Sequence, residues 1–72
     1  MPLYEMKNKQ NCVIQSLPEV GLLHYLGLRE GLKVSVMSKQ PFGGPVVVQM
    51  GNNRSIAISK EIAQQISVAE VS

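Results

Sequence analysis

Apolar and polar residues alternate along several short runs of this chain. The clearest run covers residues 33–38, where Val34 and Val36 are separated by Ser35 and lie between Lys33 and Met37. A period of two is typical of a strand with one buried face. The same pattern at Cys12 and Ile14, or a run of β-branched residues, predicts further strands at residues 11–16, 46–50, 55–58 and 66–71.

Two segments are expected to be helical. The first begins near residues 16–18, because the first turn of a helix tolerates proline and its amino-terminal end favours the carboxylate of Glu19. The apolar stripe of this helix, at helical spacing, consists of Val20, Leu23 and Leu26, widened by Leu22. The second helix, residues 60–65, follows Ser59, a residue type that caps helices well.

Glycines and prolines mark the turns. Gly27 ends the first helix and Gly31 leads into the strand at residue 33, both at points that favour a positive φ. The segments Pro41–Pro45 and Gly51–Asn53 each join two predicted strands as a tight turn. About five short strands with one or two short helices predict a mainly β fold, a small SH3-like barrel rather than a ferredoxin-like fold.

Composition restricts the classes of function. The 72 residues are expected to form a single domain, 1–72, with 44% hydrophobic and only 17% charged residues. A domain of this size buries only about 60% of its unfolded surface, which favours docking on a partner or weak homo-oligomerisation. The net charge of +2 comes from scattered cations, so the chain lacks the basic stripe of a nucleic-acid-binding protein.

The chemistry of enzymes and metal sites is missing from the sequence. Cys12 is the only cysteine and His24 the only histidine, too few for a metal site or an intramolecular disulfide. No nucleophile–base pair indicates a catalytic residue, and Gly43-Gly44-Pro45 lacks the residues that follow a phosphate-binding loop. We expect a non-enzyme without cofactor, in which Met37 and Met50 fill the core.

No targeting or membrane-spanning segment is expected. Residues 1–11 carry Glu5, Lys7 and Lys9 and lack the apolar centre of a signal peptide. No apolar run approaches the roughly 20 residues that cross a bilayer. The sequence therefore predicts a cytoplasmic protein with no direct membrane insertion, which a membrane partner could recruit to the inner face of the cell membrane.

In order and spacing, the motifs resemble those of the FeoA family, the ferrous iron transport protein A. The resemblance covers about residues 13–68 and includes Leu26-Gly27-Leu28 followed by Gly31, and the turn with Gly43-Gly44-Pro45. The same module resembles the carboxy-terminal domain of metal-dependent repressors of the diphtheria toxin repressor type. Two departures are Lys9-Gln10-Asn11, where the family often has a glycine, and Ser59, where it often has an arginine.

The resemblance implies an SH3-like barrel that works as an adapter. FeoA-like proteins are thought to act with FeoB, a membrane iron permease with a cytosolic GTP-binding domain. The expected partner is therefore the cytosolic region of a FeoB-like permease, whose assembly or GTPase cycle the chain would modulate. Two alternatives are a stand-alone regulatory protein-binding domain of the repressor type and a small RNA-binding barrel.

The candidate docking residues are large apolar or cationic side chains near predicted turns. Aromatic residues and arginines are the usual anchors of protein interfaces. Tyr25 and Leu28 flank the end of the first helix, and Phe42 lies at the tip of a turn. Together with Arg29 and Arg54, they are the residues expected to contact the partner.

Overall fold

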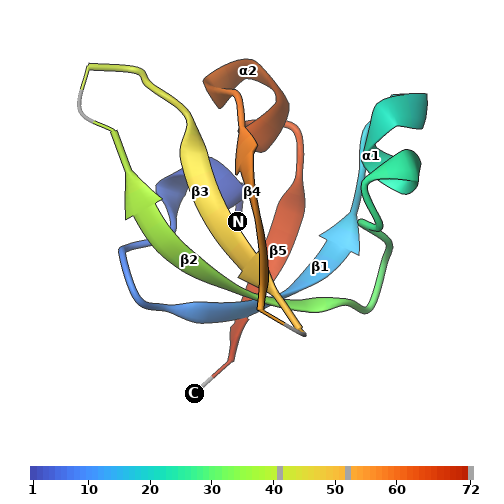
Figure 1. Ribbon diagram of the computed structural model, residues 1–72, viewed down its shortest axis with the longest axis horizontal. Helices are drawn as coiled ribbons and strands as arrows, with labels where there is room; N and C mark the ends of the chain where they lie inside the picture. Colours follow the sequence, from blue (N-terminus) through green and yellow to red (C-terminus); the bar gives the residue numbers. More distant parts are fainter. Residues whose placement is uncertain (41, 52, 72) are drawn as a thin grey trace.

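An antiparallel sheet of five strands, in the order β4-β3-β2-β1-β5, curls into an SH3-like barrel (Figure 1). This computed structural model describes residues 1–40, 42–51 and 53–71, so the predicted turn residues Pro41 and Asn52 lie outside the described residues. The strands are β1 Asn11–Ser16, β2 Lys33–Lys39, β3 Val46–Met50, β4 Arg54–Ile58 and β5 Ser67–Val71. The helices are the 3-10 turn η1 Leu3–Glu5, α1 Gly21–Tyr25 and α2 Lys60–Ala63. The mainly β fold expected from the alternation is confirmed.

The inward face of the sheet follows the period-two pattern of the sequence. Cys12 pairs with Val34 across β1 and β2, and Val36 pairs with Val48 across β2 and β3. All four side chains are buried. Because directly paired residues place their side chains on the same face, they build a continuous apolar layer inside the barrel. The core is thus made mostly of β-branched residues, which suit a pleated sheet.

The amino-terminal segment covers the outer edge of β5. The backbone N–H of Val68 donates to the carbonyl of Met1 at 2.7 Å, and that of Leu3 donates to the carbonyl of Ile66 at 2.8 Å. The side chain of Leu3 is fully buried. Residues 1–10 are therefore part of the barrel, and their first residues pair with β5 much as a short edge strand would.

Helix α1 is shorter than the sequence predicts. It begins at Gly21 and not near Ser16, because Ser16 still pairs with Ser67 at the end of β1. Pro18 then disfavours a helical conformation at the residue before it, and its carbonyl accepts a hydrogen bond from the N–H of Val20 at 2.8 Å. Little more than one turn of helix is left before the loop to β2.

The short helix changes which of its side chains are buried. Leu23 is buried in the core, and Val20 and Leu26 are half-buried, as the predicted stripe requires. The expectation that Leu22 widens the buried stripe is wrong, since its side chain is 57% exposed. A helix of little more than one turn presents only one side to the barrel, and the exposure of Leu22 places it on the other side.

The second helix and the methionines also differ in part from expectation. Helix α2 ends at Ala63, and Ser59 occupies its N-cap, but through its backbone carbonyl alone, which accepts the N–H of Ala63 at 2.8 Å. Met50 is buried as expected. Met37 is 48% exposed, so its assignment to the core is wrong, because it follows inward-facing Val36 and so lies on the outer face of β2.

Candidate functional site

Helix α1 stands at one end of the molecule and exposes two large apolar side chains. Tyr25 is 87% exposed, and Leu22 lies three residues before it. Residues spaced by three lie on the same side of a helix, so the two side chains share a face that points away from the core. Tyr25, one of the expected docking residues, therefore lies on the surface, and Leu22 extends the apolar surface beside it.

The end of α1 is fixed by backbone hydrogen bonds that bury Leu28. The N–H of Gly27 donates to the carbonyl of His24 at 3.0 Å, and the N–H of Leu28 donates to that of Leu23 at 2.9 Å. This pair of bonds is the Schellman motif, which requires the positive φ of 97° found at Gly27. The motif commonly packs the residue after the glycine against the last turn of the helix.

Leu28 is therefore a core residue and not a docking residue. Its side chain is only 1% exposed, and it belongs to the same buried cluster as Leu23. The expectation that Leu28 contacts a partner is wrong. The order Leu23-x-x-x-Gly27-Leu28 contains the signal that could have shown this, since a leucine after a helix-ending glycine matches the Schellman pattern.

Arg54 connects the beginning of β4 to the end of α1. Its Nη2 atom donates a hydrogen bond to the carbonyl oxygen of Leu26 at 3.3 Å. That carbonyl lies at the carboxyl end of the helix, where the backbone dipole favours a positive charge. The contact brings together residues that are 28 positions apart in the chain.

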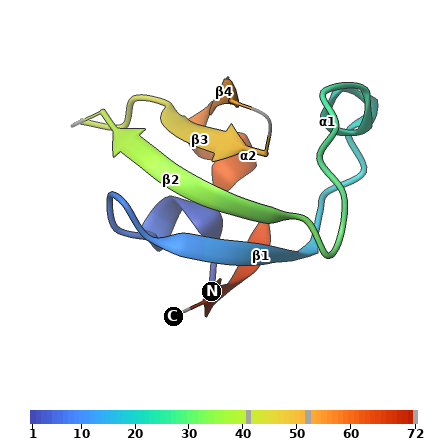
Figure 2. The same ribbon diagram turned by 60° about the horizontal axis from the view of Figure 1, so that its bottom comes forward.

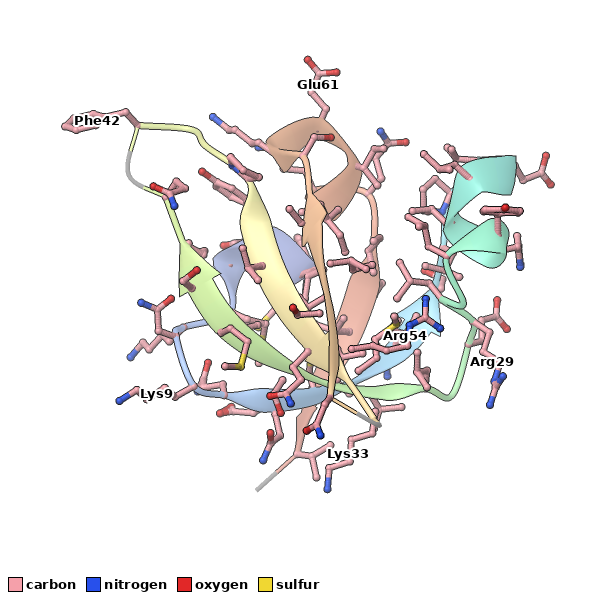
Figure 3. All side chains as sticks on the ribbon, in the orientation of Figure 1. Lys9, Arg29, Lys33, Phe42, Arg54 and Glu61 are labelled. Carbon is pink, nitrogen blue, oxygen red and sulfur yellow. The ribbon has the colours of Figure 1, made fainter. Side chains whose placement is uncertain are left out.

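A shallow groove separates the loop after α1 from the turn between β3 and β4. Arg29 and Arg54 both line it, and they lie on the same side of the molecule (Figure 3). The complete lining consists of Gly27, Arg29, Leu32, Met50, Gly51 and Arg54. The groove thus combines two cations with apolar side chains and has no carboxylate among the described residues that line it. Such a surface favours an anionic group on a partner.

Phe42 lies at the other end of the molecule, on the hairpin between β2 and β3. Figures 1 and 2 show that hairpin and α1 on opposite sides of the barrel, and Figure 3 places Phe42 far from Arg29 and Arg54. The side chain is 104% exposed, which confirms its predicted exposure. The five predicted docking residues therefore do not form one surface: Tyr25, Arg29 and Arg54 lie at the α1 end, Phe42 lies apart, and Leu28 is buried.

Cys12 and His24 do not form a common site. Cys12 is fully buried in β1 and His24 is exposed on α1. Burial raises the pKa of the Cys12 thiol, which keeps it neutral and unreactive in the folded protein. Within residues 1–40, 42–51 and 53–71, no three histidine, cysteine or acidic residues are grouped as a metal site.

No helix among these residues is long and apolar enough to span a membrane.

Comparison with known sequences identifies the family. The FeoA domain matches residues 1–70 of this chain, nearly its whole length. The chain belongs to the FeoA family. The departures at residues 9–11 and at Ser59 thus leave the FeoA pattern intact, and the SH3-like barrel is the fold that this family shares. No sequence among the curated proteins matches the chain.

Solved structures of FeoA proteins have the same fold. The crystal structure of an iron uptake regulatory protein, FeoA, is 25% identical, with a TM-score of 0.87 over 99% of this chain and 96% of that one. The FeoA protein from Chlorobium tepidum is 28% identical, with a TM-score of 0.87 over 100% of this chain and 71% of that one. A manganese-dependent transcriptional repressor in complex with manganese reaches a TM-score of 0.89, over 99% of this chain and 36% of that one. Its identity of 13% shows a shared fold and nothing more.

Proposed function

We propose that this protein is an accessory protein of ferrous iron uptake, which docks on the cytosolic region of a FeoB-like permease and modulates its assembly or GTPase cycle. Membership of the FeoA family carries the proposal, because the match extends over residues 1–70. A similar structure described above, that of an iron uptake regulatory protein, agrees with a role in iron uptake.

The α1 end supplies the surface on which docking would depend. It presents Tyr25 and Leu22 on α1, and the lining of the groove that holds Arg29 and Arg54 begins at Gly27, two residues after Tyr25. An exposed aromatic residue next to arginines has the composition of an interface centre. A regulator changes its target only if it binds two states of the target with different affinity, so we expect this surface to bind one nucleotide state of the permease more tightly.

The first test is the affinity of the chain for the cytosolic region of a FeoB-like permease from the same organism. Titration calorimetry would compare the protein with the variant Tyr25→Ala. We expect the variant to bind at least about tenfold more weakly, the loss typical of a well-buried aromatic anchor. Its melting temperature should stay within a few degrees, since the side chain makes few contacts in the free protein.

Met37→Ala is the matched control. It also removes an exposed, large apolar side chain, but from the outer face of β2. Equal losses in both variants would mean that the contact is unspecific. Absence of any binding by the unaltered protein, with GTP or with GDP present, would contradict the proposal.

A further inference from the structure

The two edges of the sheet differ in how their backbone groups are occupied. The outer edge of β5 is paired with the amino-terminal segment through Met1 and Pro2. Strand β4 is the opposite edge and pairs with β3 alone. No backbone hydrogen bond joins Arg54–Ile58 to a described residue outside β3. Every second residue of β4 therefore directs an N–H and a C=O away from the sheet.

The free edge of β4 has few of the features that natural proteins use to block edge pairing. Proline, inward-pointing charges, bulges and lysines are the usual devices. β4 contains no proline, pairs with β3 without a register shift, and has a charge only at Arg54. Ser55 and Ala57 are exposed and small, so another strand could approach the edge closely.

The positive charge at the beginning of this edge favours an acidic partner strand. Arg54 is the first residue of β4 and also lines the groove with Arg29. The floor of that groove includes the apolar residues Leu32 and Met50. A strand laid along β4 and continuing past Arg54 would place its side chains beside two guanidinium groups, which bind carboxylates well.

We infer that β4 is a strand-addition site, which binds an extended acidic segment of a partner protein with its carboxylates beside Arg29 and Arg54. Strand addition takes its affinity from main-chain hydrogen bonds and its specificity from alternate side chains. The inference deepens the proposed function, and rests on it only for the identity of the partner. A second copy of this chain is a poorer occupant, because its β4 contains no carboxylate to lie beside Arg29 and Arg54.

The test uses the full chain and a peptide, so that it does not depend on the permease. A capped peptide of alternating Glu and Val is titrated into ¹⁵N-labelled protein, and amide shifts and hydrogen exchange are recorded. We expect shifts and slowed exchange at amides of Arg54–Ile58, with no comparable effect from a peptide of alternating Lys and Val. Arg54→Glu should weaken the binding of the acidic peptide about tenfold.

Lys9→Glu is the control variant, because it makes the same change in net charge at an exposed residue remote from Arg54 and Arg29 (Figure 3). It should bind the acidic peptide as the unaltered protein does. Unaffected β4 amides with millimolar acidic peptide would overturn the inference. So would equal binding of both peptides, or β4 shifts that depend on protein concentration alone, which would make a second copy the occupant.

The permease fragment separates the two proposals. If it binds and slows the exchange of β4 amides, both are supported. If it binds and leaves β4 unchanged, the strand-addition site is wrong for this partner while the docking proposal stands. If the acidic peptide protects β4 and the permease fragment does not bind, the site stands and the proposed partner is wrong.

Discussion

The α1 end and the hairpin between β2 and β3 both expose a large aromatic side chain, but they are built differently. Tyr25 at the α1 end is accompanied by Leu22 and by two arginines, one of which comes from β4. Phe42 protrudes from a single hairpin. The shape of a surface assembled from segments far apart in sequence depends on the whole fold. The shape of a protruding hairpin depends mainly on the hairpin itself.

The two regions also differ in backbone strain. At the α1 end, the positive φ falls on Gly27, which adopts it without steric strain. In the hairpin, Phe42 itself has a φ of 62°, a conformation that costs a non-glycine residue roughly 1 kcal/mol or more. We therefore expect the α1 end to supply most of the docking energy and Phe42 to supply a minor contact.

Leu28→Ala should have the largest effect, and it should act on stability. The side chain is buried beneath the α1 end, and truncation of a buried leucine costs about 2–5 kcal/mol of the free energy of unfolding. Urea unfolding of this variant and of Tyr25→Ala measures the contrast. Tyr25→Ala should lose less than about 1 kcal/mol, as is usual for exposed positions. Similar losses in the two variants would contradict the placement of these two side chains.

The double variant Arg29→Glu/Arg54→Glu should have the next largest effect, on binding. Reversal of both charges beside the groove should weaken permease binding by about tenfold or more, and added salt should reduce the difference. Calorimetry at two salt concentrations measures both effects. Lys7→Glu/Lys9→Glu has the same net charge and should bind nearly normally. If the two double variants lose affinity equally, the attraction is a property of the net charge and not of the groove.

Phe42→Ala should have the smallest effect. The exposed side chain contributes little to stability, so the free energy of unfolding should change by less than about 0.5 kcal/mol. We expect permease binding to weaken, but by less than for Tyr25→Ala. A large loss of melting temperature would show that Phe42 packs in the core. An affinity loss greater than that of Tyr25→Ala would reverse the order of the two ends.

The sequence predicts the strands well because alternation records burial directly. Val34 and Val36 face inward as expected, and the bounds of β3 match the prediction. The helices are predicted less well. Helix α1 has only five residues, too few for the spacing of apolar residues to show where the helix begins. A helix of little more than one turn owes its position to neighbouring contacts, here the pairing of Ser16 with Ser67.

The docking residues could be predicted only in part. The exposure of Phe42 followed from its place at the tip of a turn, but its separation from Tyr25 depends on how the sheet curls. The proximity of Arg54 to the end of α1 is a long-range contact that no local pattern records. The unpaired edge of β4 could not be predicted from the sequence either. Which edge of the sheet stays unpaired depends on the strand order and on the pairing of Met1 with β5.

The most direct test of the account is a backbone amide NMR spectrum of the labelled protein, with and without the cytosolic region of its cognate permease. We expect shift changes concentrated at Leu22–Arg29 and along β4, with smaller changes around Phe42. An unchanged spectrum at high concentration of the permease fragment would contradict docking on that region. Changes confined to the hairpin or to the amino-terminal segment would contradict the α1 end as the docking surface.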